Sequence, residues 1–289
     1  MPRPIALILC LAAFLASPAR ADTALLREAT GLMGLAMWLD SGAPGMVLVV
    51  VRGSDTLVQG YGETTKGNGR GPDGRSLLRI GSVSKVFTTE LLAGMVAEGK
   101  VRLTDPLQQY AATGVTVPRS GDRAITLLDL ATHSAGLPRE IGEVPPDTVP
   151  FTWPTKQQRW SFLAGYKLPW APGTVAAYSN VGFDLLADAL TVAGGKDYPA
   201  VLHHRITGLL GMADTGVAPT QEQCDRLMTG SGLGGPGPCA DTSASEATAA
   251  STPQEVTWGC GCITTSPNAT PWSGRPWRSH MPSIASARP

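Results

Sequence analysis

A serine and a lysine three residues apart form the first pattern in this chain that could do chemistry. From Ser82 onward, apolar residues recur at three- and four-residue steps, which predicts an amphipathic helix ending at Gly99. Ser82 and Lys85 would share one face of that helix, and its free N–H groups could stabilise an oxyanion. Lys85 could take the serine proton if burial or a nearby cation lowered its pKa, or by acting through a neighbour. The alternative is an N-cap serine with a solvated lysine.

A second pattern, Tyr178-Ser179-Asn180, follows a Pro172-Gly173-Thr174 turn. A phenol can act as a base or an acid when a lysine ammonium lowers its pKa. The amide of Asn180 can hold an amide of a substrate. Taken alone, the tyrosine could equally be a half-buried surface aromatic.

The surrounding chain predicts both helices and strands. Helical spacing covers residues 26–39, and shorter helices are expected at 125–130 and 198–210. The β-branched run 46–51 and the segment 56–59 flank a glycine-containing turn, which predicts a β-hairpin.

Composition narrows the class of protein only slightly. The 289 residues are 43% hydrophobic, enough for a folded core, and 16% charged. The 23 basic residues equal the 23 acidic ones, so no charge excess points to nucleic acid. We expect no nucleic-acid partner, and the sequence does not indicate an oligomeric state.

The first 21 residues predict an export signal. Arg3 precedes an apolar run, residues 5–15, and Ala19-Arg20-Ala21 has the small-x-small form of a cleavage site. A membrane anchor is the alternative, but this run is too short to cross the hydrocarbon core. Leu9 before Cys10 argues against a lipoprotein anchor. We therefore expect cleavage after Ala21 and a periplasmic protein without a stable membrane anchor.

Cys224 and Cys239 flank a glycine-rich loop. In an oxidising compartment they are candidates for a disulfide that would stabilise the fold by about 3 kcal/mol. Cys260-Gly261-Cys262 is too short for an easy mutual bridge, and no second ligand pair stands near it for zinc. We expect no metal site.

Five segments in order resemble the serine β-lactamase and penicillin-binding family. The resemblance covers about residues 30 to 248 and is closest to class C-like enzymes that trim peptidoglycan as D-alanyl-D-alanine carboxypeptidases and endopeptidases. The segments that carry it are 80–88, 99–106, 125–138, 172–180 and 210–215.

The resemblance implies an α/β (α+β) fold of the β-lactamase/transpeptidase type, an antiparallel sheet flanked by helices with an all-helical region. It makes Ser82 the nucleophile, Lys85 its activator and Tyr178 the general base and acid. Asn180 would orient the substrate and Lys85. His133 would pack structurally rather than act in catalysis. No cofactor is implied, and the substrate would be a peptidoglycan peptide or a β-lactam.

The end of the sequence departs from the family. The Lys/His-Thr/Ser-Gly triplet that the family carries on a late strand does not follow Tyr178. Residues 249–289 keep neither helical nor strand periodicity, and hold one acid, Glu255, and no lysine. We expect an incomplete domain over 22–248 without its C-terminal strands, followed by a disordered tail from a shifted reading frame. The gene sequence tests that frame shift.

Three functions remain open at this point. The first is a periplasmic serine hydrolase that acts on D-Ala-D-Ala peptides through an acyl-enzyme and binds β-lactams. The second is a class C-like β-lactamase. The third is a truncated, inactive remnant.

Overall fold

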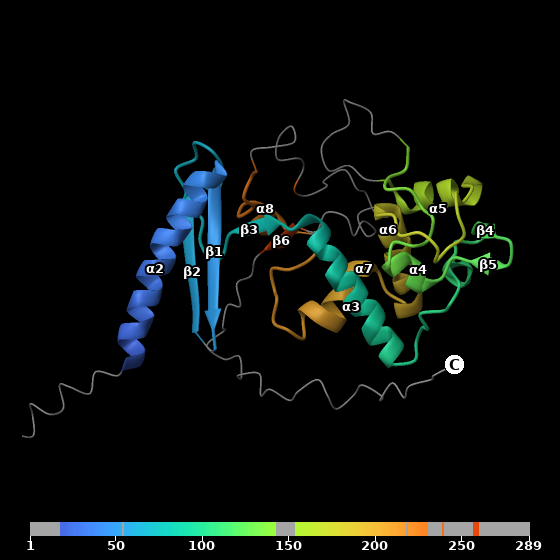
Figure 1. Cartoon of the computed structure of the whole chain (residues 1–289), viewed down its shortest axis with the longest axis horizontal. Coiled ribbons are helices and arrows are strands. Elements are labelled where there is room, and N and C mark those ends of the chain that lie inside the picture. The colour runs from blue at the N-terminus through green and yellow to red at the C-terminus, as the bar shows by residue number, and fades with distance from the viewer. Residues whose placement is uncertain are drawn as a thin grey trace, which may run out of the picture.

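A helix lying along a β-hairpin forms the N-terminal layer of the structure (Figure 1). This computed structural model describes residues 18–53, 55–142, 154–217, 219–230, 239 and 257–259. Helix α2 (Pro18–Ser41) leads into β1 (Gly45–Arg52) and β2 (Asp55–Gly62), which pair antiparallel with Gly45 opposite Gly62. The expected helix and hairpin are therefore present, and each is longer than the sequence pattern predicted.

Tyr61 on β2 joins the hairpin to α2. Its hydroxyl lies 3.3 Å from the carbonyl oxygen of Thr30 and 3.2 Å from that of Gly31. A Cβ added at Gly34 would overlap the same hydroxyl, so a glycine is needed for this close approach. The α2 helix also begins before the expected cleavage point after Ala21, and residues 1–17 of the expected signal lie outside the described residues.

The remaining helices form a second region, here called the helical body (residues 80–142 and 154–217). Helix α3 (Ser84–Ala97) follows the 3₁₀ turn η1 (Gly81–Val83), and Gly99 ends this element with φ +70°. Its other elements, in chain order, are η2 (Leu107–Tyr110), β4 (Arg119–Ser120), β5 (Arg123–Ala124), α4 (Leu127–Ala131), α5 (Lys156–Gly165), α6 (Asn180–Gly194), α7 (Tyr198–Leu202) and η3 (His203–Thr207).

Helix α6 is the centre of the helical body (Figure 1), and every residue from Asn180 to Leu190 is buried. It contacts α3, α4, α5 and α7. The apolar core around it includes Leu91, Met95, Leu127, Leu163, Leu186 and Trp160. An ion pair lies within this core, with Nη2 of Arg159 on α5 at 2.9 Å from Oδ1 of Asp188 on α6. Burial of this kind requires such pairing, because a lone buried charge is costly.

Strand β3 (Leu77–Arg79) lies between the N-terminal layer and the helical body (Figure 1). It pairs antiparallel with β6 (Thr257–Gly259), and Leu77 also forms a parallel bridge with Leu227. Strand β6 lies within the segment that we expected to be a disordered tail. The other residues of that segment lie outside the described residues.

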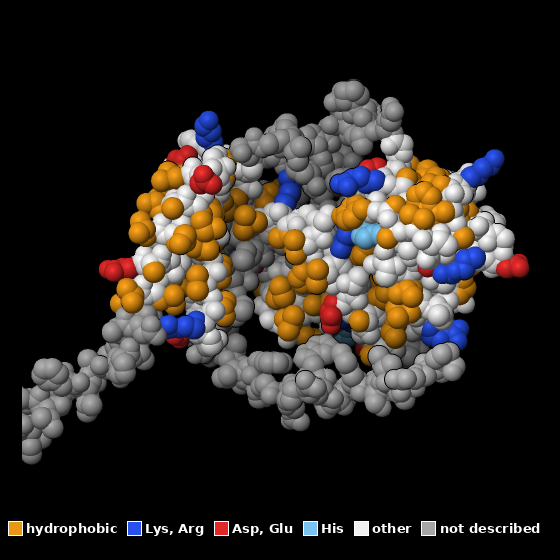
Figure 2. Space-filling view, in the orientation of Figure 1, with side chains coloured by type: hydrophobic (Ala, Val, Ile, Leu, Met, Phe, Trp, Pro, Cys, Tyr) orange, Lys and Arg blue, Asp and Glu red, His pale blue; other side chains and the backbone are white. Residues whose placement is uncertain are grey.

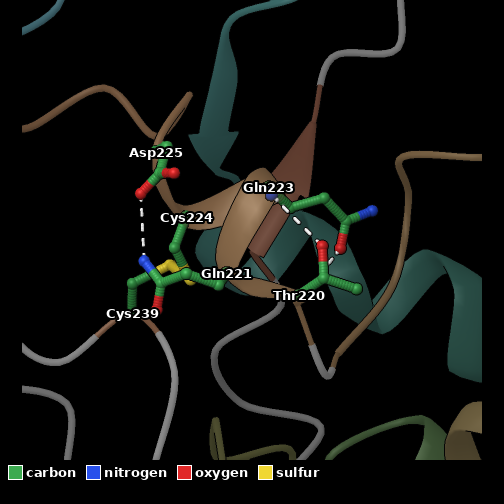
Figure 3. Close-up of a disulfide and its surroundings, with 6 residues drawn as sticks. All are labelled: Thr220, Gln221, Gln223, Cys224, Asp225 and Cys239. Carbon is green, nitrogen blue, oxygen red and sulfur yellow. Dashed lines mark hydrogen bonds between the residues drawn. A yellow bond between two sulfur atoms is a disulfide. The ribbon is translucent and has the colours of Figure 1, made fainter.

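A disulfide joins Cys224, at the end of the short helix α8 (Gln221–Cys224), to Cys239 (Figure 3). This is the pairing that the sequence suggested. Thr220 begins the helix with a capping box, in which its hydroxyl accepts from the backbone N–H of Gln223. The loop between the two cysteines lies mostly outside the described residues.

Several helices differ from the sequence-based expectation. The helix expected over 198–210 is divided into α7 and the π-helical turn η3. The sequence pattern did not indicate α5 or α6. Among the described residues, no helix has both the length and the apolar character needed to span a membrane.

Candidate active site

The side chains of Ser82 and Tyr178, 96 residues apart in the chain, are in contact at the N-terminal end of α3. Their side-chain oxygens lie 2.5 Å apart. Ser82 stands in η1 directly before the helix, where Gly81 takes a left-handed conformation with φ +50°. Ser82 is exposed to solvent, and so is Tyr178, with 38% of its surface accessible. Neither η1 nor α3 begins with a side-chain cap hydrogen bond, and the Ser82 hydroxyl faces the tyrosine instead.

Lys85 donates hydrogen bonds to both Ser82 and Asn180. Its Nζ donates to Oγ of Ser82 at 3.4 Å and to Oδ1 of Asn180 at 2.8 Å. The same ammonium lies 5.0 Å from the ring centroid of Tyr178 and 5.5 Å from that of Phe183. Rings at this distance attract a cation through their electron-rich faces. The structure therefore brings together all four residues that the sequence selected for chemistry.

The environment of Tyr178 lowers the pKa of its phenol below the ordinary value of 10.0. Burial is the largest single influence and raises the pKa, because it disfavours the phenolate. Hydrogen bonding to Lys85 and Ser82, with the positive charges of Lys85 and Arg139, outweighs that effect. A phenol with a lowered pKa, in contact with a hydroxyl, is suited to accept that proton.

His133 supports the tyrosine from the side. Its ring centroid lies 4.5 Å from that of Tyr178 and 4.8 Å from that of Phe183. The backbone N–H of Ser179 donates to Nδ1 of His133 at 3.1 Å. Burial and the charge of Lys85 lower the pKa of His133. The histidine has a φ of +57°, the only positive value among the described non-glycine residues. These contacts fit the packing role expected from the sequence.

Three consecutive residues, Pro138 to Glu140, run along the turn that carries Tyr178 and Asn180. The carbonyl oxygens of Pro138 and Arg139 accept from the Ser179 hydroxyl at 2.6 Å and the Asn180 N–H at 3.0 Å. The guanidinium carbon of Arg139 lies 5.0 Å from the ring centroid of Tyr178. Sequence reasoning missed Arg139 and Glu140. They directly follow the 125–138 segment of the resemblance, and this adjacency was the one available signal.

Ser179 explains why the turn and the helix are fixed relative to each other. It is the N-cap of α6, and its Oγ accepts from the N–H of Gly182 at 2.9 Å. Asn180 is consequently the first residue of a buried helix. The cap and the hydrogen bond from its N–H to Arg139 hold its backbone in place.

The chemistry that this arrangement can perform is nucleophilic attack by a hydroxyl. Ser82 has an acceptor for its proton in Tyr178, and an adjacent ammonium in Lys85 that stabilises the phenolate. Over the described residues, no group of three His, Cys, Asp or Glu side chains is placed to hold a metal ion.

Solved structures share this architecture. The crystal structure of a β-lactamase/D-alanine carboxypeptidase from Yersinia pestis has a TM-score of 0.69 and 43% sequence identity, covering 78% of this chain and 62% of that chain. A class C β-lactamase from Rhodobacter sphaeroides, 21% identical, has a TM-score of 0.59 and covers 80% of this chain and 62% of its own. The fold is thus of the β-lactamase/transpeptidase type, as the sequence led us to expect.

Sequence comparison identifies the family. Residues 23–273 match the family model described as Beta-lactamase. The D-alanyl-D-alanine-carboxypeptidase/endopeptidase AmpH of Escherichia coli K12 is 46% identical over 204 residues, which cover 71% of this chain and 52% of that protein. The chain belongs to the beta-lactamase family. It spans about half the length of the curated relatives that it matches.

Proposed function

We propose that this protein is a serine hydrolase that forms an acyl-enzyme on D-Ala-D-Ala peptides of peptidoglycan and binds β-lactams. The observation that supports it most directly is the 2.5 Å approach of Ser82 Oγ to the phenol oxygen of Tyr178, beside Lys85. The relatives named as D-alanine carboxypeptidases supply the substrate class. The hydrolase domain is taken as residues 22–248.

In the acylation step, Ser82 Oγ attacks the carbonyl carbon of the D-Ala-D-Ala bond. Tyr178 acts as a phenolate that Lys85 stabilises; the proton of Ser82 passes to its oxygen, and the negative charge moves to the former carbonyl oxygen of the tetrahedral intermediate. The C–N bond then breaks, and Tyr178 gives its proton to the nitrogen of the leaving D-alanine. Asn180 holds Lys85 and orients the substrate amide. The product is an ester between Ser82 and the remaining peptide.

In the deacylation step, water attacks the same carbonyl carbon. Tyr178 takes a proton from the water and passes it to Ser82 Oγ, which leaves as the hydroxyl. This returns the enzyme to its starting state and releases a shortened peptide. A β-lactam follows the same acylation, with its ring nitrogen as the tethered leaving group.

A β-lactamase is the second candidate function. The family model and the class C structural neighbours favour it. The two candidates differ in the fate of the penicilloyl ester, which a β-lactamase hydrolyses rapidly and a carboxypeptidase retains. The proposal includes export to the periplasm through a cleaved segment, residues 1–21, and the disulfide between Cys224 and Cys239 fits an oxidising compartment.

Fluorescent penicillin tests the proposal. The purified chain should acquire one covalent label, and Ser82→Ala should acquire none although it remains folded by circular dichroism. A D-Ala-D-Ala peptide should release D-alanine, and the label should persist longer than a single peptide turnover takes. Rapid loss of label would favour the β-lactamase. A folded chain that neither takes the label nor releases D-alanine would be the inactive remnant, and the proposal would fail.

A further inference from the structure

The side-chain amide of Asn180 is held at both ends. Its Oδ1 accepts from Lys85 at 2.8 Å, and its Nδ2 donates to Oε1 of Glu140 at 2.5 Å. The backbone N–H of Asn180 donates in turn to the carbonyl of Arg139. Asn180 is 8% exposed, so few water molecules can replace these partners.

The chemistry of Glu140 matters because an amide has two unlike ends of nearly the same shape. An ionised carboxylate only accepts hydrogen bonds, whereas the amide can offer either an NH₂ group or an oxygen. A carboxylate beside Asn180 therefore selects the NH₂ end. The oxygen is left on the opposite side, where Lys85 lies.

We propose that Glu140 is a positioning residue: it turns the amide oxygen of Asn180 onto Lys85 and so holds the ammonium beside Ser82 and Tyr178. Its effect on acylation rests on the function proposed above. Its effect on the orientation of Asn180 does not.

A neutral amide at position 140 would no longer favour one orientation of the Asn180 amide over the other. The amide of Gln could pair with Asn180 in either orientation, because it carries both a donor and an acceptor. In one of the two orientations, Asn180 would point its NH₂ group at the Lys85 ammonium, where two donors face each other. Lys85 would then lose the acceptor that fixes its distance from Ser82.

Two substitutions that exchange the roles of the pair test this directly. Glu140→Gln should slow acylation by fluorescent penicillin about 10- to 100-fold, the range for loss of a hydrogen bond to a charged group. Asn180→Asp should slow it more, because two carboxylates would then face each other. In the double variant, the new carboxylate at position 180 accepts from both Lys85 and the new amide at position 140. Its rate should exceed the product of the single effects by about tenfold or more.

Proton–nitrogen correlation NMR reports the orientation of the Asn180 amide and does not depend on catalytic activity. In the unchanged chain, the side-chain NH₂ signals of Asn180, identified by their loss in Asn180→Asp, should form one set. In Glu140→Gln they should shift and either broaden or split into two. Glu90→Gln, an exposed change on α3, is the matched control and should alter neither the rate nor these signals.

Two results together would overturn the positioning role. One is a double-variant rate that equals the product of the two single effects, and the other is a set of Asn180 signals that does not change in Glu140→Gln. If the unchanged chain takes no label, the proposed function fails, and the NMR comparison alone decides the role of Glu140. One set of signals in both proteins would then refute it.

Discussion

The helical body and the N-terminal layer bury their apolar side chains very differently. In α6, Leu185, Leu186 and Leu190 are fully buried. On α2, large apolar side chains are largely in solvent, with exposed fractions from 41% to 73%: Leu25, Leu32, Met33, Leu35, Met37 and Leu39. Figure 2 shows hydrophobic side chains gathered on the surface of this layer. One region is thus packed on several sides, and the other on one face only.

The candidate active site lies in the more tightly packed of these two regions. Ser82, Lys85, Tyr178, Asn180 and Glu140 all belong to the helical body, and the hydrogen bonds that join them stay within it. The site geometry therefore depends on the packing of α3 and α6. The N-terminal layer is expected to affect it little.

The largest expected effect would show whether the helical body alone carries the chemistry. Tyr178→Phe should reduce the acylation rate about 10²–10⁴-fold, the usual contribution of a general base. Folding should be unaffected, because the ring and its contacts with His133 remain. Stopped-flow labelling with fluorescent penicillin measures the rate. An unchanged rate would remove Tyr178 from the mechanism and leave Lys85 as the base.

A comparison of a buried with an exposed ion pair tests how strongly burial in the helical body raises the cost of losing a carboxylate. Asp188→Ala should lower the free energy of unfolding by about 3–5 kcal/mol, because the Arg159 charge then stays buried without its carboxylate. Glu98→Ala, which removes an exposed carboxylate from Arg205, should cost no more than about 1 kcal/mol. Urea unfolding followed by circular dichroism measures both. Equal losses would mean that burial does not separate the two pairs.

A matched pair of leucines sharpens the comparison further. Leu186→Ala, in the fully buried part of α6, should cost about 2–5 kcal/mol of unfolding free energy. Leu32→Ala on α2, where the side chain is 73% exposed, should change it by no more than about 0.5 kcal/mol. A large loss at Leu32 in urea unfolding would show that something covers this face of α2.

The smallest expected effect concerns pH. With Tyr178 as the base, the acylation rate rises as the phenol loses its proton, and the lowered pKa places that rise below pH 10.0. Arg139→Ala removes one of the positive charges that lower this pKa, so the rise should move to higher pH. At neutral pH the rate should fall less than about tenfold, because an exposed charge contributes up to about 1 kcal/mol. A pH profile that stays in place would assign its rise to another group.

Sequence reasoning reached the parts of the fold that depend on local pattern. The hairpin followed from a β-branched run, and the helix after Ser82 from its apolar spacing. Helix α6 was missed although Asn180, Asp184 and Asp188 recur every four residues; this polar stripe is buried in the folded chain, so it marks a face packed against protein and not the solvent face of an amphipathic helix. Glu140 escaped for another reason. Its contact with Asn180 spans 40 residues, and spacing within one element cannot indicate such a contact.

The site is assembled from segments that lie far apart in the chain, with Ser82 and Tyr178 separated by 96 positions and Lys85 and Asn180 by 95. An unfolded chain brings none of these groups together. Under the proposed function, a penicillin that acylates Ser82 would label only correctly folded molecules, and the labelled fraction of a preparation would then measure the refolding yield.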